Sequence, residues 1–284
     1  MREVKVIAKR SDGQVFSYEN ADWGILELDG LSFPPIEIFK KNRGFGNGAI
    51  ITGKRKDARE IDIVATSRNR ANNTIDRKRA LAFHNSNYTF DLYITYLDTT
   101  RIAKECELQG AKCPTGNVYD RQILTVNYLA ADADLFEDSS VITQFKNVYP
   151  LWHVARAYPP DGSLAFGYTE NATSKIIEYL GSEPAPVVAT IMATGAVEDI
   201  TVKVRDISVT VRCNLGSGDV LVVDSENRII TLNGMRIPEN QYNGLDLPNL
   251  LVKYGDNFMQ IIAGDPGNVA FETDLKFTGR YGGI

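Results

Sequence analysis

The residues best suited to chemistry in this sequence are two histidines, which stand far apart at His84 and His153. A zinc site needs several ligands, and neither histidine has a second ligand-type residue nearby in a zinc-binding pattern. A lone histidine near the predicted end of a helix is more often a hydrogen-bonded polar group than a ligand. We therefore assign no metal site to either residue.

The glycine-rich stretch Gly44-Phe45-Gly46-Asn47-Gly48 has the composition of a phosphate-binding loop. Such a loop needs a strand before it and the start of a helix after it. The residues that follow Gly48 are apolar and β-prone, so the stretch predicts a tight or mobile loop instead. Gly216-Ser217-Gly218 also lacks the spacing that exposes a nucleophilic serine between a strand and a helix.

Asp132 and Asp134 are the remaining candidates for a ligand site, because hard cations take clustered oxygen ligands. Two alternating aspartates at the end of a strand are more often a solvated boundary, and we favour that interpretation. The two catalytic carboxylates of a glycoside hydrolase are defined by their distance in the folded protein, which the sequence spacing does not give. A cell-wall hydrolase therefore stays open as a minor alternative. The sequence favours a protein that is no enzyme, with no catalytic residue, cofactor or metal.

The charges are distributed unevenly along the chain, whose net charge is −5. Residues 40–79 hold twelve Lys/Arg against four Asp/Glu, whereas residues 161–284 hold nine against sixteen. A basic segment in an acidic chain can bind nucleic acid, but this one lacks the interleaved aromatic residues that stack on bases. We favour complementary faces between subunits and expect no specific nucleic-acid binding.

Composition places the chain among folded globular proteins, with 43% hydrophobic and 24% charged residues over 284 positions. No apolar run is long enough to predict a membrane span, so we expect no membrane insertion. The opening residues alternate charged and apolar types, unlike a signal peptide, and predict synthesis in a cytosol. Cys106, Cys113 and Cys213 have no metal-type spacing and are interpreted as reduced thiols.

The first half of the chain reads as strands with one helix. Val4 to Tyr18 predicts a hairpin around a Ser-Asp-Gly turn. Further on, Ile61, Ile63 and Ala65 fall on one face of a strand, and the basic residues 54–56 are expected at the tip before it. Tyr88 to Gly110 predicts a long hairpin, and Arg121 to Ala130 another strand.

The helix is predicted over Ile75–His84, with Asn73 or Thr74 as its N-cap. Four residues share roughly one side of it, namely Ile75, Arg79, Ala82 and Phe83. A strand-rich pattern with one helix favours a sheet that is covered on one face.

The second half predicts short strands separated by turns, the pattern of an all-β sandwich or jelly roll. The expected strands are 187–193, 200–204, 208–211, 220–223, 228–232, 258–262 and 271–277. A composition shift places the domain boundary within about residues 131–160, and we divide the chain into domains at 1–140 and 141–284.

A hairpin in the second half has distinctive ends. Gly218-Asp219 precedes the apolar run to Asp224, and after a turn the chain returns as Arg228 to Leu232, which Asn233-Gly234 follows. Later, Gly255 and Asn257 mark a turn before another strand, and the chain closes with a strand that ends in Arg280-Tyr281. Such punctuation is typical of β-hairpins.

The order of these features resembles the C-terminal domain of siphophage distal tail proteins. The first half is similar to that family in its opening hairpin, its arginine-bearing strand Arg59 to Ala65, its short helix and its hairpin Tyr88 to Gly110. This chain reads Asp132-Ala133-Asp134 where the family often has a proline after the aspartate. The likeness spans nearly the whole chain.

The resemblance implies a mainly β chain of the β-rich α+β class. Its N-terminal domain is expected to assemble into a ring, and we expect that ring to be a hexamer. We expect Tyr88 to Gly110 to serve as the hairpin arm of the ring. The candidate ring-interface residues are Arg59, Ile61, Ile63, Phe90, Leu92 and Ile94. The basic segment would meet acidic surface on another copy or on the tail tube protein.

The resemblance also implies a galectin-like or jelly-roll C-terminal domain that docks receptor-binding or baseplate proteins. The chain would then be a structural distal tail protein of the virion, assembled in the host bacterial cytoplasm, with the tail tube protein and a tail-associated lysin as further partners. The alternative is a carbohydrate-binding host-recognition module, because sugar sites stack on exposed aromatic rings. Its candidate stacking residues are Tyr168, Tyr179, Tyr242 and Tyr254.

Overall fold

The computed structural model describes residues 4–69, 71, 73–115, 120–150, 167–244, 246–265 and 269–284, with the backbone alone at 146–150 and 167–171. The chain forms two compact units, Met1–Asp138 with Arg280–Ile284 as unit 1 and Ser139–Gly279 as unit 2. Both crossings between the units fall within strands. The last residues, Arg280–Ile284, belong to unit 1, which the sequence did not predict. The functional division at residue 140 stays a prediction.

Unit 1 is built on an antiparallel sheet with the strand order β2-β1-β7-β8-β9-β6-β3. Its strands are β1 (Val4–Arg10), β2 (Val15–Ser17), β3 (Trp23–Asp29), β6 (Arg59–Ser67), β7 (Phe90–Tyr96), β8 (Thr99–Lys112) and β9 (Ile123–Ala130). β10 (Leu135–Gln144) pairs with β8 through Phe136 and Ile102. The long strand β8 thus has three neighbours along its length.

Side-chain alternation explains why these segments form a sheet with one buried face. Along β6, Ile61, Ile63 and Ala65 are buried while Glu60 and Asp62 face outward. The same period of two runs through β7 and β9, whose buried residues join one core cluster. One face of the sheet therefore holds the core of unit 1.

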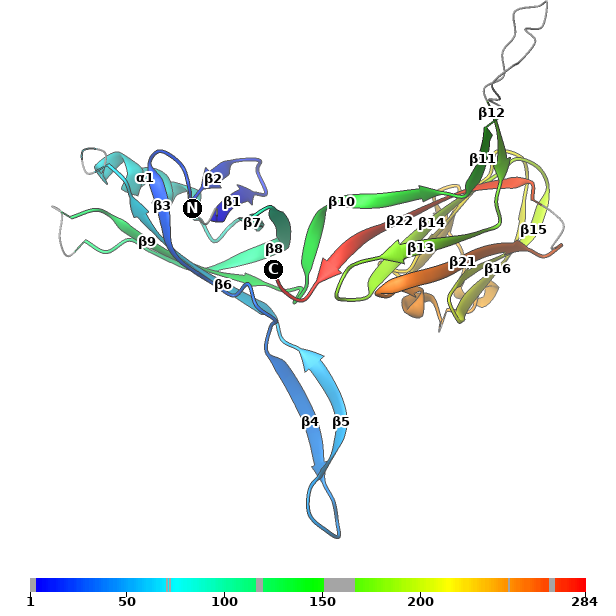
Figure 1. Ribbon diagram of the computed structural model, residues 1–284, viewed down its shortest axis with the longest axis horizontal. Helices are drawn as coiled ribbons and strands as arrows, with labels where there is room; N and C mark the ends of the chain where they lie inside the picture. Colours follow the sequence, from blue (N-terminus) through cyan, green and yellow to red (C-terminus); the bar gives the residue numbers. More distant parts are fainter. Residues whose placement is uncertain are drawn as a thin grey trace, which may run out of the picture. The chain divides into compact units, whose positions relative to one another are not determined.

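Helix α1 (Asn73–Phe83) covers that core and confirms the predicted helix (Figure 1). Its buried residues are Asp76, Ala80 and Phe83, whereas Ile75 is about half exposed. Of the four residues predicted to share one side of the helix, Phe83 is buried, and Ile75, Arg79 and Ala82 are exposed. The buried Asp76 carboxylate accepts a hydrogen bond from the Ser67 hydroxyl at 3.0 Å. This hydrogen bond allows a polar residue on the buried face of the helix. No helix among the described residues is long and apolar enough to cross a bilayer.

Two strands of unit 1 stand apart from the sheet: β4 (Ile36–Asn42) and β5 (Ala49–Lys56) pair only with each other. In Figure 1 they extend away from the sheet as a separate hairpin.

Unit 2 has two antiparallel sheets that enclose a second apolar core. The first has the order β19-β18-β17-β14-β22-β10, with β20 also on β14, and the second has the order β13-β21-β15-β16. Their bounds are β13 (Ser174–Tyr179), β14 (Ala185–Ala193), β15 (Val197–Val204), β16 (Ile207–Leu215), β17 (Val220–Asp224), β18 (Ile229–Leu232), β19 (Met235–Arg236), β20 (Leu251–Val252), β21 (Gly255–Ala263) and β22 (Phe271–Tyr281). β11 (Lys146–Pro150) and β12 (Gly167–Asn171) form a separate pair, and η2 (Glu239–Gln241) and η3 (Leu247–Asn249) are short 3₁₀ helices.

The predicted β-sandwich and the mainly β class are confirmed by these two sheets. The punctuated hairpin is β17–β18, and its two ends are tied together by side chains. Asn233 Nδ2 donates to Asp219 Oδ1 at 2.9 Å, and Val220 N donates to Asn233 Oδ1 at 2.9 Å. The hydrogen bond from Asn233, and then that from the Gly216 amide, lower the pKa of Asp219. The Gly-Asp and Asn-Gly pairs thus close the hairpin, as the sequence predicted.

Candidate assembly interface

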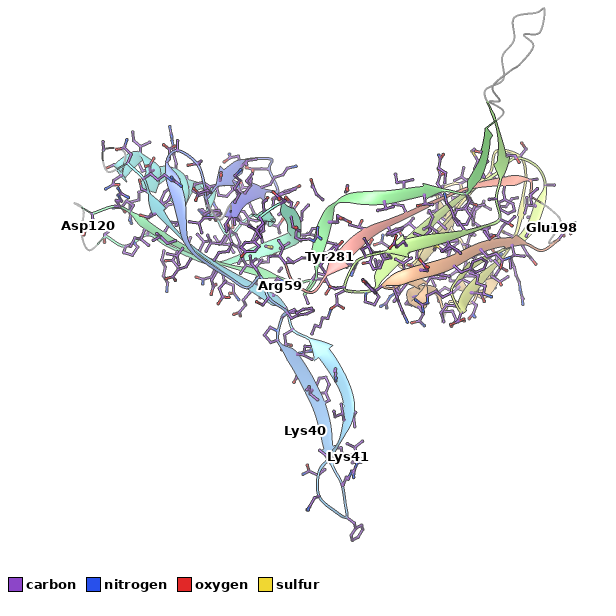
Figure 2. The ribbon with its side chains drawn as sticks, viewed as in Figure 1. Lys40, Lys41, Arg59, Asp120, Glu198 and Tyr281 are labelled. Carbon is purple, nitrogen blue, oxygen red and sulfur yellow. The ribbon has the colours of Figure 1, made fainter. Side chains whose placement is uncertain are left out.

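The hairpin β4–β5, residues 36–56, is the most exposed part of unit 1, and we call it the arm. Its strands pair from Ile36 opposite Lys56 to Asn42 opposite Ala49, with a bulge after Phe39. The glycine-rich stretch 44–48 forms its tip. Nearly every side chain of both strands is exposed, as Figure 2 shows around Lys40 and Lys41.

The arm exposes apolar side chains on both of its faces. Because cross-strand partners share a face, Ile36, Ile38 and Ile51 lie on one side, and Phe39 and Ile50 lie on the other. A two-stranded hairpin is marginally stable in water, and an exposed apolar patch marks a surface for a partner. The arm therefore presents apolar side chains on two faces that the described residues of its own chain leave uncovered.

The arm is also strongly cationic. It holds six Lys/Arg and one acidic residue, a balance of +5, so the rest of a chain with net charge −5 carries −10. Near the base, Arg55 pairs with Glu37 at 3.1 Å. Lys40, Lys41 and Arg43 have no ion pair among the described residues. The distal half of the arm thus combines uncompensated positive charge with apolar surface.

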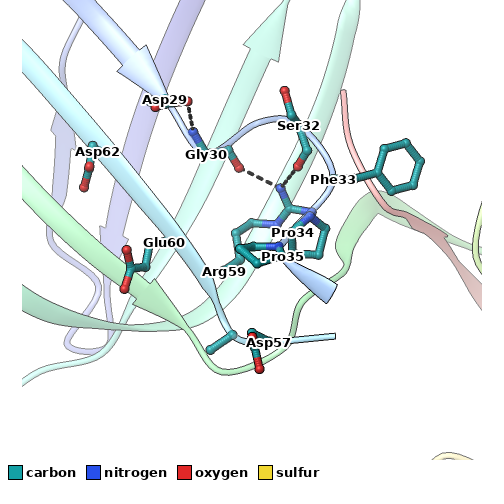
Figure 3. A pocket seen from close by; sticks show the side chains of 11 residues that line it. Asp29, Gly30, Ser32, Phe33, Pro34, Pro35, Asp57, Arg59, Glu60 and Asp62 are labelled. Atoms are coloured by element: carbon teal, nitrogen blue, oxygen red, sulfur yellow. Dashed lines mark hydrogen bonds between the residues drawn. The ribbon is translucent and has the colours of Figure 1, made fainter. Parts of the chain in front are cut away.

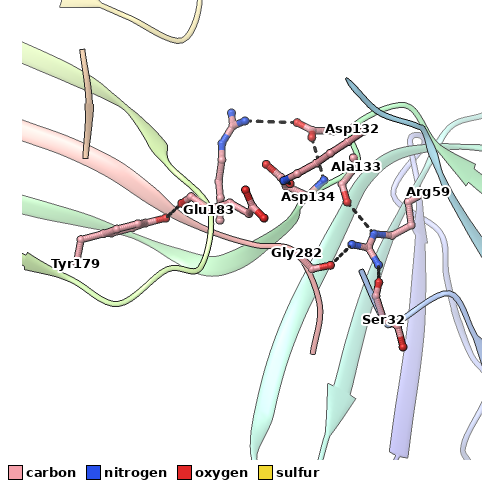
Figure 4. Close-up of polar contacts among 10 residues, drawn as sticks. Ser32, Arg59, Asp132, Ala133, Asp134, Tyr179, Glu183 and Gly282 are labelled. Atoms are coloured by element: carbon pink, nitrogen blue, oxygen red, sulfur yellow. Dashed lines mark hydrogen bonds and ion pairs between the residues drawn. The ribbon is translucent and has the colours of Figure 1, made fainter. Parts of the chain in front are cut away.

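Arg59 fixes the base of the arm through four main-chain carbonyls (Figures 3 and 4). Its Nε donates to Ala133 at 2.9 Å. Its Nη1 donates to Gly30 and to Ser32, each at 2.6 Å. Its Nη2 donates to Gly282 at 2.6 Å. One side chain therefore joins the loop that leads into the arm, the turn after β9 and the C-terminal residues.

The Arg59 side chain is 1% exposed, so its charge is taken out of water. Burial lowers the pKa of its guanidinium, and the nearby Asp134 and Asp132 raise it in opposition. An arginine stays protonated under such conditions, and its planar donors suit several acceptors at once. The cost of burial is offset by these charge-assisted hydrogen bonds.

Further contacts hold the same region. The Asp57 amide donates to the Pro35 carbonyl at 3.0 Å and closes the two ends of the arm. Lys56 Nζ lies 2.8 Å from Asp134 Oδ1, and the Ile284 amide donates to the Leu31 carbonyl at 3.0 Å. The arm is thus exposed along its length but firmly anchored at its base.

A hollow of about 410 Å³ lies at this base, on the surface of unit 1 (Figure 3). One side of it is apolar and is formed by Phe33, Pro34 and Pro35. The other side is acidic and is formed by Asp29, Asp57, Glu60 and Asp62. We call this surface the acidic hollow.

Two carboxylates of the acidic hollow lie opposite each other, and the Arg59 guanidinium that also lines the hollow is hydrogen-bonded to main-chain carbonyls instead. Asp29 and Asp62 are directly opposite on β3 and β6, an arrangement that is unfavourable for like charges. Asp29 accepts from the Gly30 amide at 2.7 Å, and Asp62 accepts from Asn127 Nδ2 at 2.6 Å. Neither residue, nor the exposed Glu60, has an ion pair among the described residues.

The structure places the six predicted ring-interface residues in the interior. Arg59 is buried as described, and the five apolar residues belong to the core cluster of unit 1, namely Ile61, Ile63, Phe90, Leu92 and Ile94. Their side chains cannot touch a neighbouring subunit, because they are covered by their own chain. The opposite face of the same strands, which carries Glu60 and Asp62, is the exposed one.

The predicted arm is corrected as well. Tyr88 to Gly110 supplies β7 and most of β8, which lie inside the main sheet between β1 and β9. The projecting hairpin is residues 36–56, and residues 54–56 lie at its base rather than at a tip. Its strands carry runs of charged residues and glycine, so they lack the alternation that identified the other strands. The signal available in the sequence was the presence of isoleucine and phenylalanine residues among the charged residues of this segment.

The four candidate stacking tyrosines do not gather on one surface. Tyr179 is buried and donates to the Glu183 carbonyl at 2.7 Å, and Tyr242 packs against the core of unit 2. Tyr168 lies in β12, where the backbone alone is described. Tyr254 is 72% exposed. The arrangement therefore offers no aromatic platform among the described side chains.

The residues that the sequence offered for chemistry are His84, His153, Asp132 and the three cysteines, and each of them that the structure describes makes structural contacts within the chain. The His84 Nδ1–H donates to the Ala80 carbonyl at 2.6 Å, so its Nε2 accepts from the Tyr18 hydroxyl at 2.6 Å, which also lies 2.8 Å from the Tyr128 hydroxyl. Burial lowers the pKa of His84 to about 4, which keeps the ring neutral. Asp132 lies 3.7 Å from Arg280, and the three cysteines are free. His153 lies outside the described residues, among which no cluster of three metal-ligating side chains occurs.

Comparison with known proteins links unit 2 to phage tails. Residues 180–281 match the family model described as the C-terminal domain of the siphovirus-type tail component. These residues contain the punctuated hairpin, the later glycine turn and the closing Arg-Tyr strand. The match confirms the resemblance on which the sequence analysis relied. No curated protein matches the sequence.

Solved structures extend the likeness to nearly the whole chain. The Dit protein of phage SPP1 (gp 19.1), described as a paradigm of the hub adsorption apparatus in phages that infect Gram-positive bacteria, aligns with a TM-score of 0.65 at 16% identity over 97% of this chain and 98% of that one. A chain from the activated, calcium-bound baseplate of phage P2 aligns with a TM-score of 0.47 at 8% identity over the full length of both. The fold of this chain is that of the SPP1 hub protein.

Proposed function

We propose that this chain is the structural distal tail subunit of a siphophage, and that six copies close into a ring at the tip of a long non-contractile tail. The observation that carries the proposal is the arm, which exposes apolar side chains on both faces while its base is fixed by Arg59. Such a surface is satisfied only when neighbouring copies cover it, and a closed ring covers every arm in the same way.

The family match of residues 180–281 and the fold of the SPP1 hub protein support a place in the tail tip. In that place unit 1 forms the ring that continues the tail tube, and unit 2 holds the receptor-binding or baseplate proteins. The tail-associated lysin is a further partner. The role is mechanical: copies hold one another and their partners by buried surface, and no bond is made or broken.

The test is electron microscopy and native mass spectrometry of the full chain, followed by antibody labelling of tails from the phage that encodes it. We expect sixfold rings with a central hole and labelling at the tail end distal to the capsid. A chain that stays a monomer both alone and beside purified tail tubes, or labelling along the whole tube, would contradict the proposal. A lytic band from the purified protein on a cell-wall zymogram would contradict its mechanical character.

A further inference from the structure

The distal part of the arm and three carboxylates of the acidic hollow have opposite charge, and neither group forms ion pairs among the described residues. The distal arm offers Lys40, Lys41 and Arg43 without ion pairs and the fully exposed ring of Phe45. The acidic hollow offers Asp29, Glu60 and Asp62 without ion pairs, beside the apolar wall 33–35. The cation that also lines it, Arg59, is buried and donates to four main-chain carbonyls rather than to these carboxylates. Charge and apolar surface therefore match between the two.

The arm of one chain cannot fill the acidic hollow of the same chain. The hollow lies where the arm begins, and strands of seven and eight residues carry the tip about 25 Å away at roughly 3.3 Å per residue. The occupant has to come from another molecule. In an assembly of identical copies, every neighbouring copy presents the same complementary tip, so a second copy of this chain is the candidate occupant.

We infer that the arm tip of one copy docks in the acidic hollow of the next copy, with Phe45 against Phe33, Pro34 and Pro35, and with Lys40, Lys41 and Arg43 beside the carboxylates. This inference rests on the proposed function, because it names the contact by which neighbouring copies join. The incoming cations separate the opposed carboxylates Asp29 and Asp62, which repel each other in the isolated subunit.

Each copy gives one tip and receives another, so the contact is heterologous and continues from copy to copy until it closes. The step between copies is set by the length of the arm. A step of about 25 Å repeated six times gives a circumference of about 150 Å. The arms then form a continuous belt whose base in every copy is fixed by Arg59.

Reversed charges test the contact in the full chain. The variant K40E/K41E makes the tip acidic, and E60K/D62K makes the hollow basic; all four side chains are exposed, so both variants are expected to fold. Each variant alone should associate at least about tenfold more weakly than the wild type in analytical ultracentrifugation. An equimolar mixture of the two, or one chain with all four changes, should regain the association, because opposite charges then face each other again.

Matched controls carry the same change of net charge elsewhere. K5E/K9E lies on exposed positions of β1, and E178K/D256K lies on exposed positions of unit 2. Neither control should weaken association. Equal weakening by the controls, or normal self-association of both K40E/K41E and E60K/D62K, would overturn the inference.

A photo-crosslinker in place of Phe45 reports the contact whether or not a ring closes. We expect crosslinked peptides from the segment 29–35 or 57–62 of another copy, and loss of this product in E60K/D62K. Crosslinks with open chains and no rings would contradict the proposed ring but support the contact. Rings whose crosslinks map elsewhere, or crosslinks to nucleic acid instead of protein, would overturn the inference and leave the ring standing.

Discussion

Arg59 shows how one buried charge can organise several distant segments. Its guanidinium serves carbonyls at Gly30, Ser32, Ala133 and Gly282, which no other described side chain reaches together. A methionine of similar volume would leave all four acceptors without that donor in a buried place. The residue that the sequence singled out as an interface contact is instead a buried anchor of the arm's base.

We expect Arg59→Met to destabilise unit 1 by about 3 kcal/mol or more, because several buried acceptors lose a charge-assisted hydrogen bond at once. Urea unfolding followed by circular dichroism measures the change. Arg55→Met is the matched control, since Arg55 is two-thirds exposed and its substitution should stay within about 0.5 kcal/mol of wild type. Equal stability of the two variants would argue against the anchoring role.

His84 is expected to make stability depend on pH. Its folded pKa of about 4 lies below the usual 6.5, so as the pH falls the unfolded chain binds a proton before the folded one does. Stability from this residue is complete above about pH 6.5, is lost between about pH 6.5 and 4, and amounts to about 3 kcal/mol in total.

The measurement is the difference in unfolding free energy between wild type and His84→Gln at pH 7.5 and pH 4.5. Subtraction removes the contribution of the carboxylates that both proteins share. We expect the advantage of wild type to shrink by about 2 to 3 kcal/mol at the lower pH. A difference that does not change with pH would mean that His84 is solvated in the native state.

At the scale of elements, the arm differs from the hairpin β7–β8 in how little of it is buried among the described residues. β7 and β8 have neighbours on both sides and contribute Phe90, Leu92 and Ala103 to the core. The arm contributes no residue to that core. Its sequence therefore adds nothing to the core that stabilises unit 1.

Replacing residues 37–55 with a two-residue Gly-Gly turn should therefore separate stability from assembly. We expect the unfolding free energy of the subunit to change by less than about 1 kcal/mol, because no core contact is lost. Association measured by sedimentation should disappear. As a comparison, Ile61→Ala in the core should cost about 2 to 5 kcal/mol. A shortened protein that still forms rings would show that the arm is dispensable.

At the scale of the whole molecule, the chain leaves unit 1 after Asp138 and returns to it at Arg280. The last residues complete unit 1, since Gly282 accepts from Arg59, and Ile284 packs against the core cluster and donates to Leu31. Unit 2 is thus an insertion in unit 1 rather than a simple appendix.

Truncation after Tyr281 should weaken unit 1 although it removes three small or apolar residues far along the chain. We expect a loss of about 2 kcal/mol, from the contact of the partly buried Ile284 with the core and from the unpaired donor of Arg59. Hydrogen exchange followed by mass spectrometry should show faster exchange in segments 28–35 and 57–60, with unit 2 unchanged. Faster exchange confined to unit 2 would contradict the placement of the C-terminal residues.

The sequence alone determined those features that one chain settles by itself. Alternation with a period of two identified Ile61, Ile63 and Ala65 as one buried face, and the Asp219 and Asn233 punctuation identified a hairpin in the sandwich. Only the tertiary structure decided which hairpin projects. Tyr88 to Gly110 reads equally well as an arm or as central strands, because its neighbours β1 and β9 come from distant segments. Residues 36–56 show little alternation, because nearly all of their side chains are exposed on both faces of the arm. A pattern of burial can be written into a sequence only where burial occurs.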